Sequence, residues 1–228
     1  WGRVYEAYSD DPVLNSKLGS AYITGTQSRG ENVPVVLASA KHYLATGAMQ
    51  WGQSNNENFK IDQGKIIADE TKLNNEYLLP YKSAVDSGVA SIMVGLNQWG
   101  DDRIIDSKYL VTEKLKNELG FEGFVVSDWY GVYEYSKSSK YDANIKTINA
   151  GLDMAMLPYD YKSFMRDVRK AVNNGAISKE RIDDAVSRIL RQKFKAGLFN
   201  QIILIQALLA QMKTMNLPAK QLHHLQYC

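Results

Sequence analysis

Charged side chains stand directly after apolar runs at two points of the chain, and this arrangement could support covalent catalysis. Ser127 and Asp128 follow the run at 124–126, and the pair Lys41-His42 follows the run at 34–40. In parallel α/β folds the active site lies at the carboxyl ends of the strands, so we expect these residues to share one cleft. Positive neighbours keep a carboxylate ionised, as a nucleophile requires. The sequence therefore predicts Asp128 as a candidate nucleophile flanked by cationic donors.

Both features also have simpler explanations, which the sequence leaves open. Asp128 could cap a helix or close a turn, and Lys41 could be a surface lysine beside a histidine whose hydrogen bonds are satisfied in the core. Asn97 and Trp129 also stand at strand ends and would lie at the same edge of the sheet.

Cysteine and histidine are too scarce for several kinds of site. Cys228 is the only cysteine, and His42 is the only histidine before residues 223–224. These counts exclude a disulfide framework, an internal cysteine nucleophile and a multi-histidine metal site. No Gly-x-Gly-x-x-Gly motif or phosphate loop follows a strand, which argues against a nucleotide. We therefore expect no metal and no cofactor, and a Ser-His-Asp relay could run only through His42.

The composition is that of a globular protein. Of the 228 residues, 45% are hydrophobic and 23% are charged, and the formal net charge is +2. This balance gives no electrostatic reason to expect nucleic acid or an anionic membrane as a partner. The apolar run at 202–210 is shorter than the roughly 20 residues of a membrane helix.

The elements that must position these residues alternate between strands and helices. Apolar runs without polar alternation are typical of strands buried on both faces of a parallel sheet. They occupy residues 34–40, 89–94, 124–126 and 152–156. Helices are predicted between and after them, one capped by Thr112 and ended by Gly120, another capped by Ser178. The predicted fold class is α/β with parallel strands, either part of a (β/α)8 barrel or a smaller doubly wound sheet.

A loop without periodicity follows the Lys41-His42 pair. Its sequence, ATGAMQWGQSNNEN, holds Trp51, Asn55, Asn56 and Glu57. Aromatic rings with amides and acids suit recognition of a polyol, although an ordinary exposed loop has the same composition.

Five segments resemble, in order along the chain, the signature segments of family 3 glycoside hydrolases. They are Gly2-Arg3-x-x-Glu6-x-x-Ser9-Asp10-Asp11-Pro12, Ala40-Lys41-His42-Tyr43, the stretch 120–129 (GFEGFVVSDW), Ala150-Gly151-Leu152-Asp153-Met154 and the stretch 181–190 (RIDDAVSRIL). The likeness runs from residue 1 to about residue 200. It is greatest to the β-glucosidase and exo-β-glucan glucohydrolase branch, and the absence of histidine from residues 43–62 disfavours the N-acetylhexosaminidase branch.

The resemblance implies a partial (β/α)8 TIM-type barrel and a role for several residues. Asp128 would be the nucleophile of a retaining hydrolysis that releases terminal β-D-glucosyl units from β-glucosides or β-glucans. The cationic donors to the sugar hydroxyls would be Arg3, Lys41 and His42. Trp129 and Met93 would line the same subsite, and Glu57 would correspond to a loop glutamate of the family. The sequence departs from the family at Ala45-Thr46-Gly47-Ala48 and at Leu96, so the pocket wall there is expected to differ.

The resemblance also implies a division of the chain. Residues 1–200 would be the C-terminal part of the barrel domain, and residues 201–228 a tail without assigned function, either an amphipathic helix or a frame artefact. An upstream barrel half and a downstream domain bearing the general acid are expected in the same gene product, so this piece alone is expected to be inactive.

Two other functions remain open at this point. One is a non-catalytic glycan-binding remnant, and the other is a Schiff-base lyase acting through Lys41. The resemblance implies an extracellular or lysosome-like location.

Overall fold

A computed structural model describes residues 2–28, 36–54, 57–58, 60–61, 63–134 and 136–199. The predicted tail at 201–228, loop residues Asn55 and Asn56, and the beginning of the 34–40 run lie outside the described residues.

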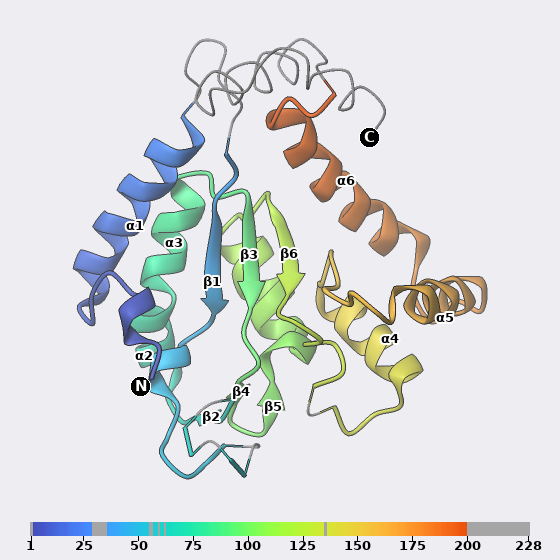
Figure 1. Cartoon of the computed structure of the whole chain (residues 1–228), viewed down its shortest axis with the longest axis horizontal. Coiled ribbons are helices and arrows are strands. Elements are labelled where there is room, and N and C mark those ends of the chain that lie inside the picture. The colour runs from blue at the N-terminus through green and yellow to red at the C-terminus, as the bar shows by residue number, and fades with distance from the viewer. Residues whose placement is uncertain are drawn as a thin grey trace, which may run out of the picture.

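Three parallel strands form the central sheet. They are β1 (Ser39–Tyr43), β3 (Ser91–Val94) and β6 (Phe124–Ser127), in the order β1-β3-β6. Beyond β6, the backbone at Met154 forms an isolated parallel bridge with Val126. Figure 1 shows the arrows of the three strands pointing to the same edge of the sheet. The predicted parallel α/β organisation is confirmed, and the sheet of the described residues is open.

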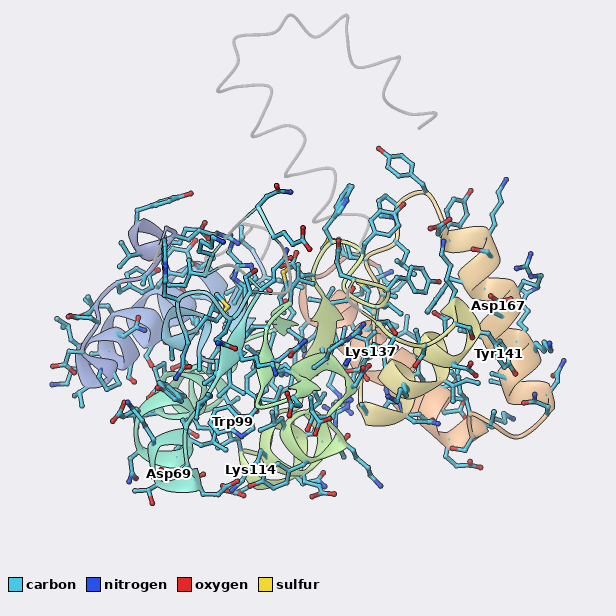
Figure 2. The ribbon with its side chains drawn as sticks, turned by 90° about the horizontal axis from the view of Figure 1, so that it is seen from below. Asp69, Trp99, Lys114, Lys137, Tyr141 and Asp167 are labelled. Carbon is cyan, nitrogen blue, oxygen red and sulfur yellow. The ribbon has the colours of Figure 1, made fainter. Side chains whose placement is uncertain are left out.

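Helices flank both sides of this sheet. α1 (Pro12–Gln27) and α3 (Leu79–Asp86) pack on each other beside β1 (Figure 1). α4 (Lys140–Ala150), α5 (Tyr161–Asn173) and α6 (Lys179–Lys195) lie beyond β6. In Figure 2, Tyr141 of α4 and Asp167 of α5 lie on one flank and Asp69 on the other. None of the helices in the described ranges is long and apolar enough to span a bilayer.

Short elements complete the chain. They are η1 (Val4–Glu6), η2 (Thr46–Ala48), β2 (Lys65–Ile66), α2 (Glu70–Lys72), η3 (Leu73–Tyr77), β4 (Gln98–Trp99), β5 (Asp102–Arg103), η4 (Ile104–Asp106) and η5 (Tyr109–Glu118). Strands β2, β4 and β5 form a second small sheet in which β4 and β5 are antiparallel. It lies below the arrowheads of the central strands in Figure 1, so it covers their carboxyl edge.

Strand β1 departs from the predicted run at 34–40. It begins at Ser39 and includes Lys41 and His42, which were expected to follow the strand. Lys41 is exposed and the side chain of His42 is largely buried, because successive residues of a strand point to opposite faces. The strand also lies at the edge of the sheet. Its successive residues therefore alternate in burial, and the strand is less apolar than one buried on both faces.

The two predicted helix caps have different outcomes. Ser178 caps α6 as predicted, since its Oγ accepts a hydrogen bond of 3.1 Å from the backbone N–H of Arg181. Thr112 is not a cap, because helix η5 already begins at Tyr109. The Thr112 hydroxyl instead donates to the carbonyl of Ala150 at 2.7 Å, a contact that local sequence cannot reveal.

A buried ion cluster ties β6 to the helices behind it. The Asp153 side chain is fully buried, and its carboxylate binds Lys116 at 2.7 Å and also Arg181. Its second oxygen accepts a 2.8 Å hydrogen bond from the backbone N–H of Val125. Burial lowers the pKa of Lys116, although Asp153 opposes the shift. These contacts fix the strand that leads to Asp128.

Gly123 lets β6 approach β3 closely. A Cβ atom at this position would lie 2.4 Å from the carbonyl oxygen of Ala90 and 2.6 Å from the ring of Phe121. Arg188 of α6 donates to the carbonyls of Phe121 and Gly123 at 2.6 and 3.0 Å. The start of β6 is therefore held from both sides.

Candidate active site

Asp128 follows the last residue of β6, where a rigid element presents its carboxylate. Oδ1 accepts a 2.6 Å hydrogen bond from the backbone N–H of Trp129, and the Asp128 carbonyl accepts one of 2.9 Å from Gly131. Oδ2 lies 3.5 Å from Nε2 of His42, and the Asp128 side chain is 23% exposed. One carboxylate oxygen is thus held by the backbone, while the other faces a histidine and an opening to solvent.

A small cavity of about 50 Å³ opens beside this carboxylate. Its lining residues come from the residue before η1, from β1, from the segment between β1 and β2, and from the residues that follow β3 and β6: Arg3, His42, Thr46, Met49, Gln63, Gly95, Leu96, Asn97 and Asp128. The structure thus brings Arg3, His42 and Asp128 together, although 125 positions separate the first from the last in the sequence. Thr46 and Leu96, where the sequence departs from the family, both line the cavity, whereas Met49 and Gln63 were not singled out in the sequence.

The surroundings of the His42 imidazole in this cavity favour its neutral form. Burial lowers its pKa below the usual range, the nearby Asp128 carboxylate opposes that shift, and the charges of Arg3 and Lys41 add to it. A neutral imidazole offers one N–H donor and one acceptor. It can therefore bind hydroxyl groups beside a carboxylate without neutralising it.

Glu6 forms ion pairs with two cations from different parts of the chain, Arg3 and Lys41. Its carboxylate binds Arg3 through two contacts, of 2.6 Å to Nε and 2.8 Å to Nη2, and binds Lys41 Nζ at 2.9 Å. The hydrogen bonds from Arg3 and then Lys41 lower the pKa of Glu6 to about 2. Lys41 therefore lies beside the cavity and is held by Glu6. The Arg3–Glu6 spacing was visible in the sequence, but the contact with Lys41 was not.

Asn97 adds a buried acceptor. It is 1% exposed, its Nδ2 donates to the carbonyl of Leu44 at 2.8 Å, and its Oδ1 has no hydrogen-bond partner among the described residues. A Cβ atom on Gly95 would lie 2.4 Å from this oxygen and 3.3 Å from Cβ of His42. A glycine therefore keeps the cavity floor open, and the Asn97 oxygen can accept a hydrogen bond from a ligand hydroxyl.

The remaining predicted residues are not among those that line the cavity. The Trp129 side chain is 53% exposed, and its ring meets Tyr130 and Tyr159 edge-on at centroid distances of 6.1 and 6.4 Å. Met93 is half-buried in β3 opposite Val126.

The loop residues Glu57 and Trp51 are exposed, and the structure does not place either of them among the cavity-lining residues.

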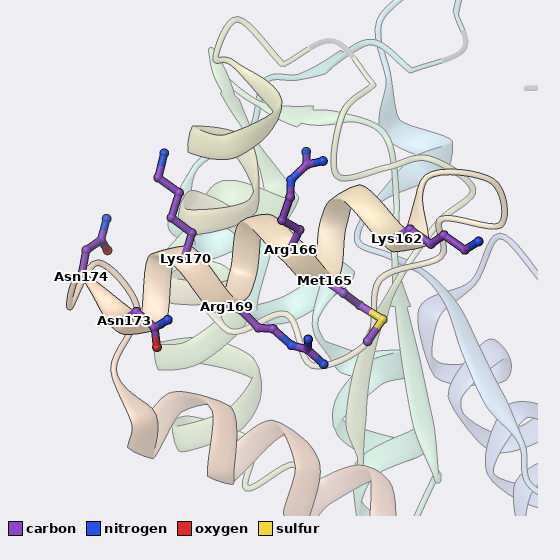
Figure 3. Close-up of a pocket in the computed structure, with 7 residues that line it drawn as sticks. All are labelled: Lys162, Met165, Arg166, Arg169, Lys170, Asn173 and Asn174. Atoms are coloured by element: carbon purple, nitrogen blue, oxygen red, sulfur yellow. The ribbon is translucent and has the colours of Figure 1, made fainter.

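A larger depression of about 640 Å³ lies along α5 and has a different character (Figure 3). It is lined by seven residues of this one segment, Lys162, Met165, Arg166, Arg169, Lys170, Asn173 and Asn174. It contains no carboxylate and is a solvated cationic helix face, so the smaller cavity is the better candidate for acid–base or nucleophilic chemistry. Within the part of the chain that the structure describes, no three His, Cys, Asp or Glu side chains group as a metal site requires.

Comparison with known proteins identifies the family. Residues 1–192 match the family described as "Glycosyl hydrolase family 3 N terminal domain". This chain belongs to glycoside hydrolase family 3. The predicted resemblance is confirmed.

Individual relatives agree with this assignment. The chain is 29% identical over 205 residues to a periplasmic beta-glucosidase of Salmonella typhimurium and 30% identical over 212 residues to a lysosomal beta glucosidase of Dictyostelium discoideum. Each alignment covers 88% of this chain and 25% of the relative, so the chain spans about a quarter of the length of these relatives.

A solved relative supports the fold. The exo-1,3/1,4-beta-glucanase ExoP of a Pseudoalteromonas species, solved as a Q683A mutant, is 36% identical, with a TM-score of 0.76 over 87% of this chain and 31% of its own. The N-terminal domain of the family is a TIM-type barrel, so the open parallel sheet is a part of a (β/α)8 barrel, as predicted.

Proposed function

We propose that this chain serves a retaining β-glucosidase-type hydrolase that releases terminal β-D-glucosyl units from β-glucosides or β-glucans. The observation that carries the proposal is the Asp128 carboxylate at the end of β6, 3.5 Å from His42 in a cavity that Arg3 also lines. The family and the names of its relatives, β-glucosidases and an exo-glucanase, support the same substrate class.

In the proposed reaction Asp128 is the nucleophile. Its carboxylate oxygen attacks the anomeric carbon, the bond from that carbon to the leaving oxygen breaks, and the leaving oxygen takes a proton from a general acid. Water then attacks the anomeric carbon of the glycosyl-enzyme, gives up a proton to the same group and frees the Asp128 carboxylate. The N–H of Trp129 holds Asp128 Oδ1, which leaves Oδ2 oriented toward the cavity.

The sugar-binding roles follow from the polarity of the cavity. Arg3 and His42 line it and would donate hydrogen bonds to the sugar hydroxyls, and Lys41 would do so beside it while Glu6 orients its ammonium group. These interactions lower the barrier to the extent that they strengthen as charge and ring shape change in the transition state.

Trp129 and Met93 would border the same subsite. Glu57 would have to approach from the loop, since its side chain is exposed and lies outside the cavity lining.

The chain would act within a longer gene product. We assign residues 1–200 to the C-terminal part of the barrel domain and expect an upstream barrel half and a downstream domain that supplies the general acid. On its own the 228-residue piece would then be inactive, and residues 201–228 take no part in the chemistry. Periplasmic and lysosomal relatives support an extracellular or lysosome-like site of action.

The two alternative functions fit the geometry less well. A Schiff-base lysine is activated by apolar surroundings or a neighbouring cation. Lys41 is 44% exposed and ion-paired to Glu6. A purely glycan-binding remnant would not need a backbone-held carboxylate beside a buried imidazole. It is distinguished from an enzyme by binding without turnover.

Covalent trapping tests the proposal. The longer gene product is incubated with an activated 2-deoxy-2-fluoro-β-glucoside, and the labelled peptide is identified by mass spectrometry. We expect the label on Asp128 and no label in Asp128→Asn. Labelling should be unchanged in Asp101→Asn, because the Asp101 carboxylate is 90% exposed and does not line the cavity. Label on another residue, or steady turnover of an aryl β-glucoside without trapping, would reject Asp128 as the nucleophile.

A further inference from the structure

A buried arginine, Arg103, binds the backbone of the loop that follows Asp128. It belongs to β5, in the small sheet at the carboxyl edge of the central strands (Figure 1), and its side chain is 8% exposed. A guanidinium is costly to bury unless its charge is paired and its N–H groups are hydrogen-bonded. The partners of Arg103 therefore indicate what this side chain holds in place.

The guanidinium binds that loop at three points. Nη2 donates to the carbonyls of Gly131 and Val132 at 3.0 and 3.1 Å, and Nη1 donates to the carbonyl of Glu134 at 2.8 Å. The charge is paired with Asp106, whose Oδ2 lies 3.2 Å from Nε. One edge of the guanidinium thus binds a carboxylate while the remaining N–H groups gather three carbonyls. A lysine lacks this planar fork of donors.

The turn at 128–131 contains a strained residue. Tyr130 has a φ of +55°, in the left-handed region that disfavours residues with a Cβ atom. Such a conformation persists only where the surrounding contacts fix it. The Gly131 N–H donates to the Asp128 carbonyl at 2.9 Å, and the Tyr130 N–H donates to the carbonyl of Met156 at 3.0 Å. Arg103 adds the contacts that hold the far end of the turn.

The same turn orients the Asp128 carboxylate. The backbone N–H of Trp129 binds Oδ1 at 2.6 Å, and Oδ2 lies 3.5 Å from Nε2 of His42. Trp129 lies within the turn that the Gly131 N–H closes. A displacement of Gly131 therefore moves the peptide group that holds Oδ1, and the other carboxylate oxygen moves with it.

We propose that Arg103 is a positioning residue for the nucleophile: it fixes the turn after β6 and, through that turn, the orientation of the Asp128 carboxylate toward the first sugar. The inference rests on the proposed function, because it takes Asp128 as the attacking group. Arg103 is not among the residues that line the cavity. Its loss would therefore lower the rate of attack and leave the affinity for the sugar nearly unchanged.

Two variants of the longer gene product remove the hydrogen bonds to the carbonyls. Arg103→Lys keeps a positive charge beside Asp106 and loses the fork of donors. The double variant Arg103→Gln with Asp106→Asn removes both charges, so no unpaired charge stays buried if the lysine variant fails to fold.

Gln27→Ala is the matched control, because the Gln27 side chain also makes three hydrogen bonds to the backbone. It donates to the carbonyl of Gly88 at 2.8 Å and accepts from the N–H groups of Ala38 and Ala90 at 3.0 Å each. Ala38 and Ala90 precede β1 and β3, so these bonds lie at the amino edge of the sheet, away from Asp128.

The three variants are compared by the rate of trapping with an activated 2-deoxy-2-fluoro-β-glucoside, by calorimetry with glucose and by urea unfolding. We expect both Arg103 variants to slow the labelling of Asp128 about 10- to 100-fold, as a small misplacement of a reacting group does. Glucose affinity should change less than about twofold. Gln27→Ala should lower the urea midpoint and leave the trapping rate unchanged.

Three results would overturn the inference. An unchanged trapping rate in the Arg103 variants would mean that the turn needs no arginine. Equal slowing in Gln27→Ala would mean that stability alone is responsible. A loss of glucose affinity as large as the loss of rate would mean that the whole cavity is disturbed.

A measurement without turnover separates this inference from the proposed function. In the 228-residue chain, the imidazole ¹⁵N chemical shifts of His42, assigned with His42→Gln, report its contact with Asp128. We expect Arg103→Lys to change these shifts and Gln27→Ala to preserve them. If the glucoside does not label Asp128 in the unmodified enzyme, the proposed function fails, but the shifts still show whether Arg103 places the carboxylate. Unchanged shifts in Arg103→Lys would overturn the inference even when Asp128 is the nucleophile.

Discussion

The β1 side and the β6 side of the candidate site are held in different ways. On the β6 side, a fully buried carboxylate, Asp153, binds Lys116 and Arg181 and hydrogen-bonds the strand itself. On the β1 side, a single partly exposed carboxylate, Glu6, joins two cations near the protein surface. The group proposed to form a covalent bond is thus mounted on the more rigid side. The groups proposed to bind sugar lie on the side that is easier to rearrange.

The sharpest test of this difference is the removal of the buried charge. Asp153→Asn removes the buried carboxylate that Lys116 and Arg181 share and leaves them Asp184, which is 42% exposed, and breaking a buried ion pair in this way costs about 3–5 kcal/mol. Asp101→Asn is the matched control: Asp101 also pairs with a lysine, Lys65, but its side chain is 90% exposed, so the loss of unfolding free energy should be small. Urea unfolding of the chain, followed by circular dichroism, measures both. Similar losses in the two variants would refute the rigid β6 side.

Helix α6 offers a smaller perturbation of the same side. Ser178→Ala removes the side-chain acceptor of the Arg181 N–H and should cost about 1 kcal/mol of unfolding free energy. Because Arg181 also contacts Asp153, the double variant with Asp153→Asn should lose less than the sum of the single losses. Strict additivity in the urea experiment would mean that the cap and the ion cluster are independent.

The β1 side should respond in substrate affinity. Glu6→Gln removes the charge that orients Arg3 and Lys41, and in the full-length gene product we expect KM for a β-glucoside to rise by up to about fivefold, as for other exposed ion pairs. The stability of the chain should hardly change. Glu76→Gln, which breaks an exposed pair with Lys72, is the control and should leave KM unaltered. A large loss of stability in Glu6→Gln would contradict the comparison.

The smallest expected effect is a pH dependence. The pKa of His42 is lowered in the folded chain by burial, so the unfolded chain takes up the proton first as the pH falls. His42 therefore contributes stability that is complete above its ordinary pKa of about 6.5 and is lost as the pH falls through the folded value. His42→Gln should lose less stability than the unmodified chain between pH 7.5 and pH 5 in urea titrations. A steeper loss in the variant would show that Asp128 outweighs burial.

The sequence predicted what depends on local pattern. The apolar runs before Asn97 and Asp128 are strands β3 and β6, and Ser178 caps its helix, because burial on both faces and capping are written in neighbouring residues. The nucleophile candidate and the buried histidine also lie together, since parallel strands share one carboxyl edge.

What the sequence did not predict depends on contacts between distant residues. Threonine is a common helix cap, yet the Thr112 hydroxyl donates a hydrogen bond to the carbonyl of Ala150, 38 positions away. Glu6 and Lys41 are 35 positions apart, so their ion pair has no local signal. Glu57 was predicted as a site residue from the composition of its loop and from the family resemblance, but its side chain is exposed. The position of a loop residue depends on packing, which sequence periodicity does not encode.

Because Gly123 has no side chain, a substitution at this position would affect the placement of Asp128. Even a methyl group there would collide with backbone and ring atoms on two sides, and the relief available is a shift of β6 away from β3. Five residues later that shift would change the 3.5 Å distance between Asp128 and His42. Residue 123 does not line the cavity, yet a larger side chain there would displace the Asp128 carboxylate, so a library of random substitutions should tolerate few replacements at this position.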